Sequence, residues 1–85
     1  GKYSTALGLA SIASGELSFA AGGATEASGR ASIAMGEGAD ALADHSVAIG
    51  LGSTASGNGS LALRGGSATG ASSFALGSST ASGSN

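Results

Sequence analysis

A repeat of fourteen residues covers this chain of 85 residues and constrains its fold more than any other feature. The clearest copy reads Ser-Val-Ala-Ile-Gly over residues 46–50, with Ala55 and Gly57 downstream. The opening serines are fourteen residues apart, except that the last one comes one residue early: Ser4, Ser18, Ser32, Ser46, Ser60 and Ser73. A repeat of this length and regularity predicts a solenoid in which each copy forms one coil.

The three residues after each serine predict a first short strand in every copy. They alternate between a variable, mostly bulky residue and alanine, and this period of two is typical of a strand with distinct faces. The alanines are Ala6, Ala20, Ala34, Ala48, Ala62 and Ala75. The glycines that follow, and that we expect in turns, are Gly8, Gly22, Gly36, Gly50 and Gly77, with Arg64 standing in the remaining copy.

A second short strand is predicted later in each copy. Its middle position varies freely and includes Glu26 and Asp40, which indicates a solvent-facing position. The residues on either side of that position are small, and we expect them to point inward; the first of these two inward rows consists of Ser11, Thr25, Ala39, Ser53 and Ser67. Two strands and two turns per fourteen residues predict a parallel β-roll of about six coils. We treat residues 1–85 as one such domain and as a fragment of a longer fibrous protein.

The direction in which the bulky residues point decides whether the chain can stand alone. If the alanines fill the roll, the bulky residues form a continuous apolar stripe outside, which would mark an interface between identical chains. The reverse arrangement fills the roll better but leaves a sheet of alanine outside. We favour the first arrangement and predict an interface made by Ile33, Met35, Val47, Ile49, Leu61, Leu63, Phe74 and Leu76, with the six alanines named above in the roll interior.

Composition excludes several other classes of protein. The net charge is −2 with three basic residues, so no electrostatic footprint for nucleic acid is present. The chain has no Cys and no Pro, which rules out disulfides and a collagen helix. His45 lies between Asp44 and Ser46, but neighbouring residues on a strand point to opposite faces, so we predict a surface histidine and no catalytic site. We expect no metal site and no cofactor.

The repeat Ser46-Val47-Ala48-Ile49-Gly50, with Ala55 and Gly57 downstream, resembles the head-domain repeat of trimeric autotransporter adhesins, the YadA-like head of Gram-negative bacteria. The resemblance covers essentially the whole chain. It implies a left-handed β-roll assembled as a homotrimer, and display outside the cell on a parent protein anchored in the outer membrane. The chain departs from the family pattern at Arg64, at Ala43 in place of a glycine, and in its last two copies, which are each one residue short.

The function that the resemblance implies is attachment to host cells or to extracellular matrix proteins such as collagen, and hence a role in virulence. One alternative is a structural spacer within a surface fibre. A second is an ice-binding solenoid, which requires a flat array of threonines. The threonines Thr5, Thr25, Thr54, Thr69 and Thr80 do not share one position of the repeat, which argues against that function. The ligand-binding residues are not indicated by the sequence.

Overall fold

The computed structural model describes residues 1–77 and 80–82, and every regular element in them is a β-strand. Three-residue and two-residue strands alternate along the chain. The three-residue strands are β1 (Thr5–Leu7), β3 (Phe19–Ala21), β5 (Ile33–Met35), β7 (Val47–Ile49), β9 (Leu61–Leu63) and β11 (Phe74–Leu76). The two-residue strands are β2 (Ile12–Ala13), β4 (Glu26–Ala27), β6 (Asp40–Ala41), β8 (Thr54–Ala55), β10 (Ser67–Ala68) and β12 (Thr80–Ala81).

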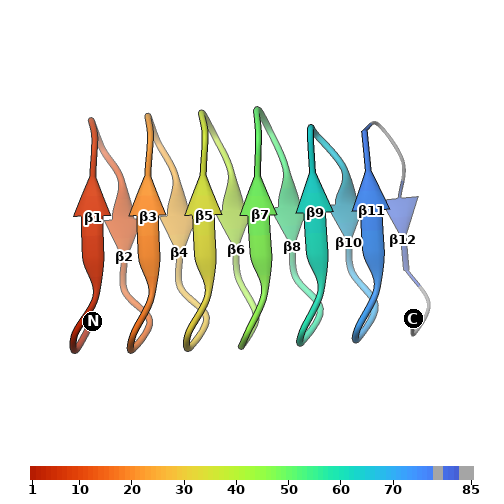
Figure 1. The fold of residues 1–85 in the computed structure, drawn as a ribbon, viewed down its shortest axis with the longest axis horizontal. Helices are drawn as coiled ribbons and strands as arrows, with labels where there is room; N and C mark the ends of the chain where they lie inside the picture. The colour runs from red at the N-terminus through yellow and green to blue at the C-terminus, as the bar shows by residue number, and fades with distance from the viewer. Residues whose placement is uncertain (78–79, 83–85) are drawn as a thin grey trace.

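The strands form two parallel sheets of six strands each. The first sheet has the order β1-β3-β5-β7-β9-β11, and the second runs β2-β4-β6-β8-β10-β12 (Figure 1). Five coils are described without a gap, and β11 and β12 belong to a sixth whose connecting residues 78–79 lie outside the described part of the chain. The predicted all-β parallel solenoid is therefore confirmed. No helix in the described residues is long and apolar enough to cross a membrane.

The coil winds in a left-handed sense. In Figure 1 the strands of the nearer sheet run upward and those of the farther sheet run downward while the chain advances from left to right. Ordinary parallel crossovers are right-handed, so this sense of winding is unusual. At several corners the backbone of a non-glycine residue takes a positive φ, as at Leu17, Ala31 and His45, where φ lies between 55° and 61°. Such conformations carry a strain of about 1–2 kcal/mol per residue.

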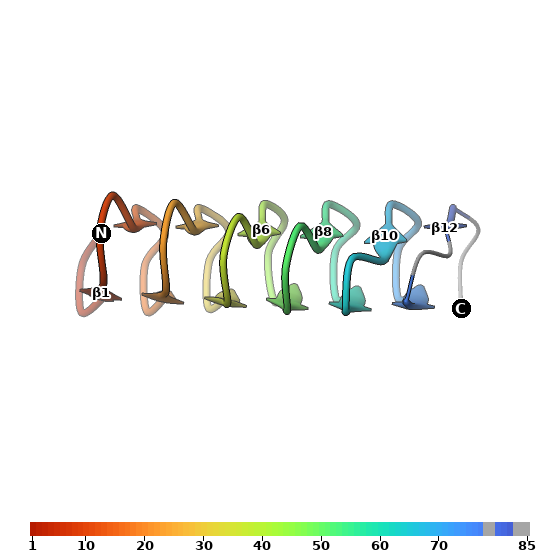
Figure 2. The same ribbon diagram turned by 90° about the horizontal axis from the view of Figure 1, so that it is seen from above.

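The two sheets lie close together, one over the other (Figure 2). Among the described residues, the side chains buried between them are alanines, six serines and Thr25. The extents of the molecule are 30 × 21 × 10 Å, which leaves no room between the sheets for larger side chains. The fully or almost fully buried alanines of the first sheet are Ala20, Ala34, Ala48, Ala62 and Ala75. Ala6 occupies the predicted inward position, in register with the buried Ala20, but it is exposed because β1 is an edge strand with a neighbouring coil on one side only.

The first row of turn glycines, from Gly8 to Gly50, lies against the neighbouring coil with no room for a side chain, whereas Gly77 at the end of the row has open space beside it. Gly22 has a φ of 124°, and a Cβ added to it would lie closer than 3.0 Å to the carbonyl oxygen of Gly36 in the next coil. The Gly22 amide donates a hydrogen bond to the carbonyl of Leu7 at 2.9 Å. The five predicted turn glycines share a positive φ: Gly8, Gly22, Gly36, Gly50 and Gly77.

Arg64 takes the place of glycine in the same row without breaking it. Its amide donates a hydrogen bond to the carbonyl of Ile49 in the preceding coil at 2.9 Å, just as the amide of Gly22 donates to Leu7. The φ of Arg64 is 52°. Gly65 follows with a φ of 83°, and the amide of Gly66 donates back to Leu63 at 3.1 Å, which closes a tight turn. Two successive positive φ values are typical of a type I′ turn, which needs one residue fewer.

The shortened turn also corrects the predicted direction of Ser67. We expected Ser67 to point inward like Ser53, but in the structure Ser67 pairs with the outward-facing Thr54. Gly66, which is buried, occupies the inward position instead. The coil is therefore one residue shorter in its turn and not in its strands, and the register of the second sheet is preserved.

Four of the opening serines close the opposite turn from inside the roll, whereas the buried Oγ of Ser60 has no hydrogen-bond partner. Ser32 donates both its amide, at 3.3 Å, and its Oγ, at 2.7 Å, to the carbonyl of Gly29. The hydroxyls of Ser18, Ser46 and Ser73 make the equivalent bonds at 2.6–2.7 Å. Because the amide and the hydroxyl of one serine both donate to the same carbonyl oxygen, these polar side chains are buried beside the alanines without loss of hydrogen bonding.

Gly15, Gly29 and Gly57 form a second row of glycines, at the turn that the opening serines close, and Gly29 provides a direct test of the coil spacing. A Cβ at Gly29 would meet the carbonyl of Ala43 far inside van der Waals contact, whereas a Cβ at Gly23 would meet only the Glu37 side chain at 3.9 Å. We expect Gly29→Ala to lower the free energy of unfolding by about 2 kcal/mol or more, because the coils must move apart. The matched Gly23→Ala change should be neutral or stabilising by about 0.4–1 kcal/mol. Denaturation followed by circular dichroism measures both, and equal stabilities would contradict the tight stacking.

Candidate functional site

The outer surface of the first sheet is a continuous apolar face. We define the apolar face as the outward side chains of that sheet, which form two rows in register from coil to coil. The first row is Thr5, Phe19, Ile33, Val47, Leu61 and Phe74; the second is Leu7, Ala21, Met35, Ile49, Leu63 and Leu76. No member of either row is charged. All eight predicted interface residues thus point outward.

The apolar face remains accessible to water even at its centre. Ile33, Met35 and Ile49 are 38%, 39% and 37% exposed, and Phe74 near the end is 55% exposed. Exposed apolar area costs about 25 cal/mol per Å², and contiguous apolar patches of this kind are rare on monomers. The physical cause lies in the thin interior, because side chains that cannot fit between the sheets must project outward.

The outer surface of the second sheet is polar over most of its length. We define the polar face as its outward row: Ile12, Glu26, Asp40, Thr54, Ser67 and Thr80. Thr54 and Thr80 therefore do share a row, with Ser67 between them. Of the other threonines, Thr5 lies on the apolar face and Thr25 is buried.

Two carboxylates lie side by side on the polar face. Asp40 pairs directly with Glu26 on the neighbouring strand. The pKa of Asp40 is raised, mainly by partial burial and secondarily by the negative charge of Glu26. Glu26 and Asp40 occupy the same position of successive repeats, and this shared position is the sequence signal that predicts their pairing.

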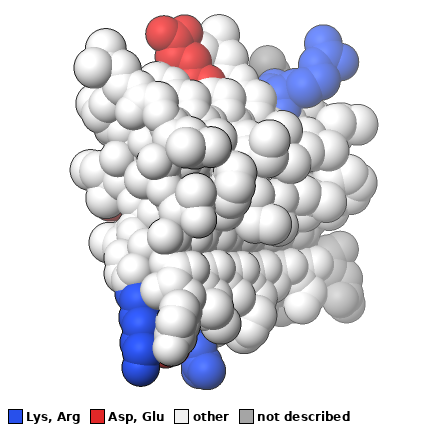
Figure 3. All heavy atoms as spheres, turned by 60° about the vertical axis from the view of Figure 1, so that its left-hand side comes forward, with Lys and Arg blue, Asp and Glu red and all other residues white. Residues whose placement is uncertain are grey.

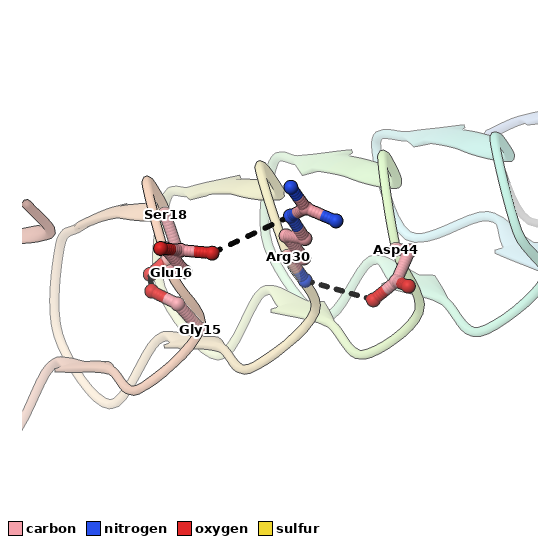
Figure 4. Close-up of polar contacts among 5 residues, drawn as sticks. All are labelled: Gly15, Glu16, Ser18, Arg30 and Asp44. Atoms are coloured by element: carbon pink, nitrogen blue, oxygen red, sulfur yellow. Dashed lines mark hydrogen bonds and ion pairs between the residues drawn. The ribbon is translucent and has the colours of Figure 1, made fainter. Parts of the chain in front are cut away.

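Charged residues otherwise gather at the edges of the roll. Figure 3 shows charged side chains mainly at the upper and lower margins of the molecule, with a broad uncharged surface between them. On one edge, the Nε of Arg30 lies 3.5 Å from Oε1 of Glu16, and Oδ1 of Asp44 accepts a hydrogen bond from the Arg30 amide at 3.0 Å (Figure 4). The ion-paired side chains are 65% and 45% exposed, so this pair contributes about 0–1 kcal/mol.

The residues around His45 do not form a proton relay. His45 is exposed, while Ser46 is buried and its Oγ donates to the carbonyl of Ala43 at 2.7 Å. Within residues 1–77 and 80–82, no group of three His, Cys, Asp or Glu side chains could hold a metal ion, and no pocket is found.

The Asp40–Glu26 pair should make stability depend on pH. Because the pKa of Asp40 is raised in the folded chain, the folded state binds this proton more tightly, and its stability falls as the pH rises through the raised value. We expect Asp40→Asn to be more stable than the wild type at neutral pH and equal to it in acid. Glu26→Gln should reproduce part of this effect. Thermal unfolding between pH 3 and 7 tests this, and parallel pH profiles for Asp40→Asn and wild type would contradict it.

Comparison with known protein families identifies the family of this chain. A family model described as the YadA head domain repeat (2 copies) matches residues 1–25, 27–53 and 41–63. These segments together cover more than half of the chain. No curated protein matches it.

Proposed function

The chain belongs to the family of YadA head domain repeats, and from this membership we propose that it is the head of a homotrimeric adhesin on the surface of a Gram-negative bacterium. The family is an adhesin repeat and not an enzyme family. In this proposal the parent protein is anchored in the outer membrane, and the head attaches the cell to host cells or to matrix proteins such as collagen.

The observation that carries the proposal is the uncharged apolar face. A surface of this kind needs a partner, and identical chains related by rotation provide one at every coil. Three rolls standing side by side around an axis parallel to the solenoid would bury their apolar faces against one another. Their polar faces would then point outward, where each is presented three times.

Threefold presentation suits an adhesin without a pocket. A flat polar row offers weak contacts, and three linked copies convert them into useful avidity. The hydroxyls of Thr54, Ser67 and Thr80 repeat at the strand spacing of about 4.8 Å, which suits an extended fibrous ligand.

The oligomeric state is the first test of this function. We expect a solution mass near three times 7.7 kDa, measured by sedimentation or light scattering. Ile49→Lys should shift the protein to monomers, because a lysine charge would be buried in the interface. Thr54→Lys, on the opposite sheet, should leave the trimer intact. A trimer that survives Ile49→Lys would place the interface elsewhere.

Binding to immobilised collagen tests the ligand. Because Thr54→Lys alters all three polar faces of the trimer, we expect it to weaken collagen binding by about tenfold or more. Asn58→Lys, which adds the same charge on the edge of the roll, is the control. Unchanged binding by Thr54→Lys would exclude the polar row as the ligand site. A wild-type trimer that binds neither collagen nor host cells would favour the spacer function.

A further inference from the structure

We propose that the two rows of the apolar face pair with each other between copies of the chain, so that Phe19 of one copy packs over Ala21 of the next. This inference rests on the proposed trimer. It concerns a feature that trimer formation alone does not require, namely the matching of side-chain sizes at each coil.

The sizes of the side chains in the two rows are complementary in the first two coils. In the first coil, the first row has the small Thr5 and the second row the large Leu7. In the second coil the order is reversed, with the large Phe19 in the first row and the small Ala21 in the second. In the third, fourth and fifth coils both rows carry large aliphatic residues, as Ile33 with Met35, and in the sixth coil Phe74 accompanies Leu76. A small residue in one row is therefore offset by a large residue in the other row of the same coil.

The symmetry of the assembly brings these two rows together. Rotation about an axis parallel to the solenoid keeps every coil at its own height. It also places the first row of one copy against the second row of the next, because the contact is heterologous around a ring. Phe19 then faces Ala21 of the neighbouring copy, and Thr5 faces its Leu7. The first rows of two copies would face each other only if the two rolls ran in opposite directions.

The size of the face requires close packing at every coil. The longer extents of the molecule are 30 and 21 Å, so the face spans on the order of 600 Å². A standard stable interface uses about 800 Å² per partner, and a trimer divides the face between two neighbours, so the whole face must be engaged. The uncharged rows also allow two copies to meet without like-charge repulsion.

Mixing two complementary variants tests the pairing. Phe19→Ala leaves small residues in both rows of the second coil, whereas Ala21→Phe leaves two large ones. Trimers of either variant alone contain three mismatched contacts, gaps in one case and clashes in the other. A mixed trimer contains only one, because an alanine row then meets a phenylalanine row twice. Chains are refolded together and their trimers are counted by native mass spectrometry, with two mass-labelled wild-type chains as the control.

We expect the ratio of mixed to unmixed trimers to exceed that of the wild-type control by about tenfold. A statistical mixture of the two variants would overturn the pairing, because Phe19 would then pack within its own chain. In that case, a trimer formed by the wild-type chain would still support the proposed function. A wild-type monomer would instead overturn the trimer itself, and the pairing with it.

Discussion

The spacing between neighbouring coils is the constraint on which the rest of this structure depends. Parallel strands in a hydrogen-bonded ladder lie about 4.8 Å apart, and the turns must keep the same spacing as the strands. At Gly22 and Gly29 the backbone of the next coil occupies the place where a Cβ would be. The glycine rows and the opening serines, which close the turns from inside, follow from this close approach.

The thin interior has the most important consequence for function. With alanine, serine and one threonine filling the space between the sheets, the described residues bury no large side chain in the roll, and the larger apolar groups project from the first sheet. In most small domains the bulky residues form the core of a single chain. Here the equivalent apolar surface lies outside; in the proposed trimer identical chains would share it, and folding would be linked to assembly.

The same architecture explains how variation is tolerated. Arg64 replaces a turn glycine and the turn loses one residue, yet the pairing of Ser67 with Thr54 shows that the second sheet keeps its register. On the polar face, Glu26, Asp40 and Thr54 pair with one another along the outward row, so different side chains occupy the same position of successive coils. The coils therefore differ in their outer surface and in one turn while the two sheets keep their register.

The sequence by itself determined the solenoid, its strands and its turn glycines, because a fourteen-residue period with alternating alanine is compatible with little else. It left open whether the alanines or the bulky residues lay inside, since both arrangements obey the same alternation. Only the tertiary structure decided this, through the small separation of the sheets. The sequence pattern misplaced Ser67, because the tight turn at Arg64 to Gly66 absorbs the missing residue before it. It also gave no sign that Ala6, which faces the interior in register with Ala20, would be exposed on an edge strand. Both findings depend on how the coils stack, which no single repeat encodes.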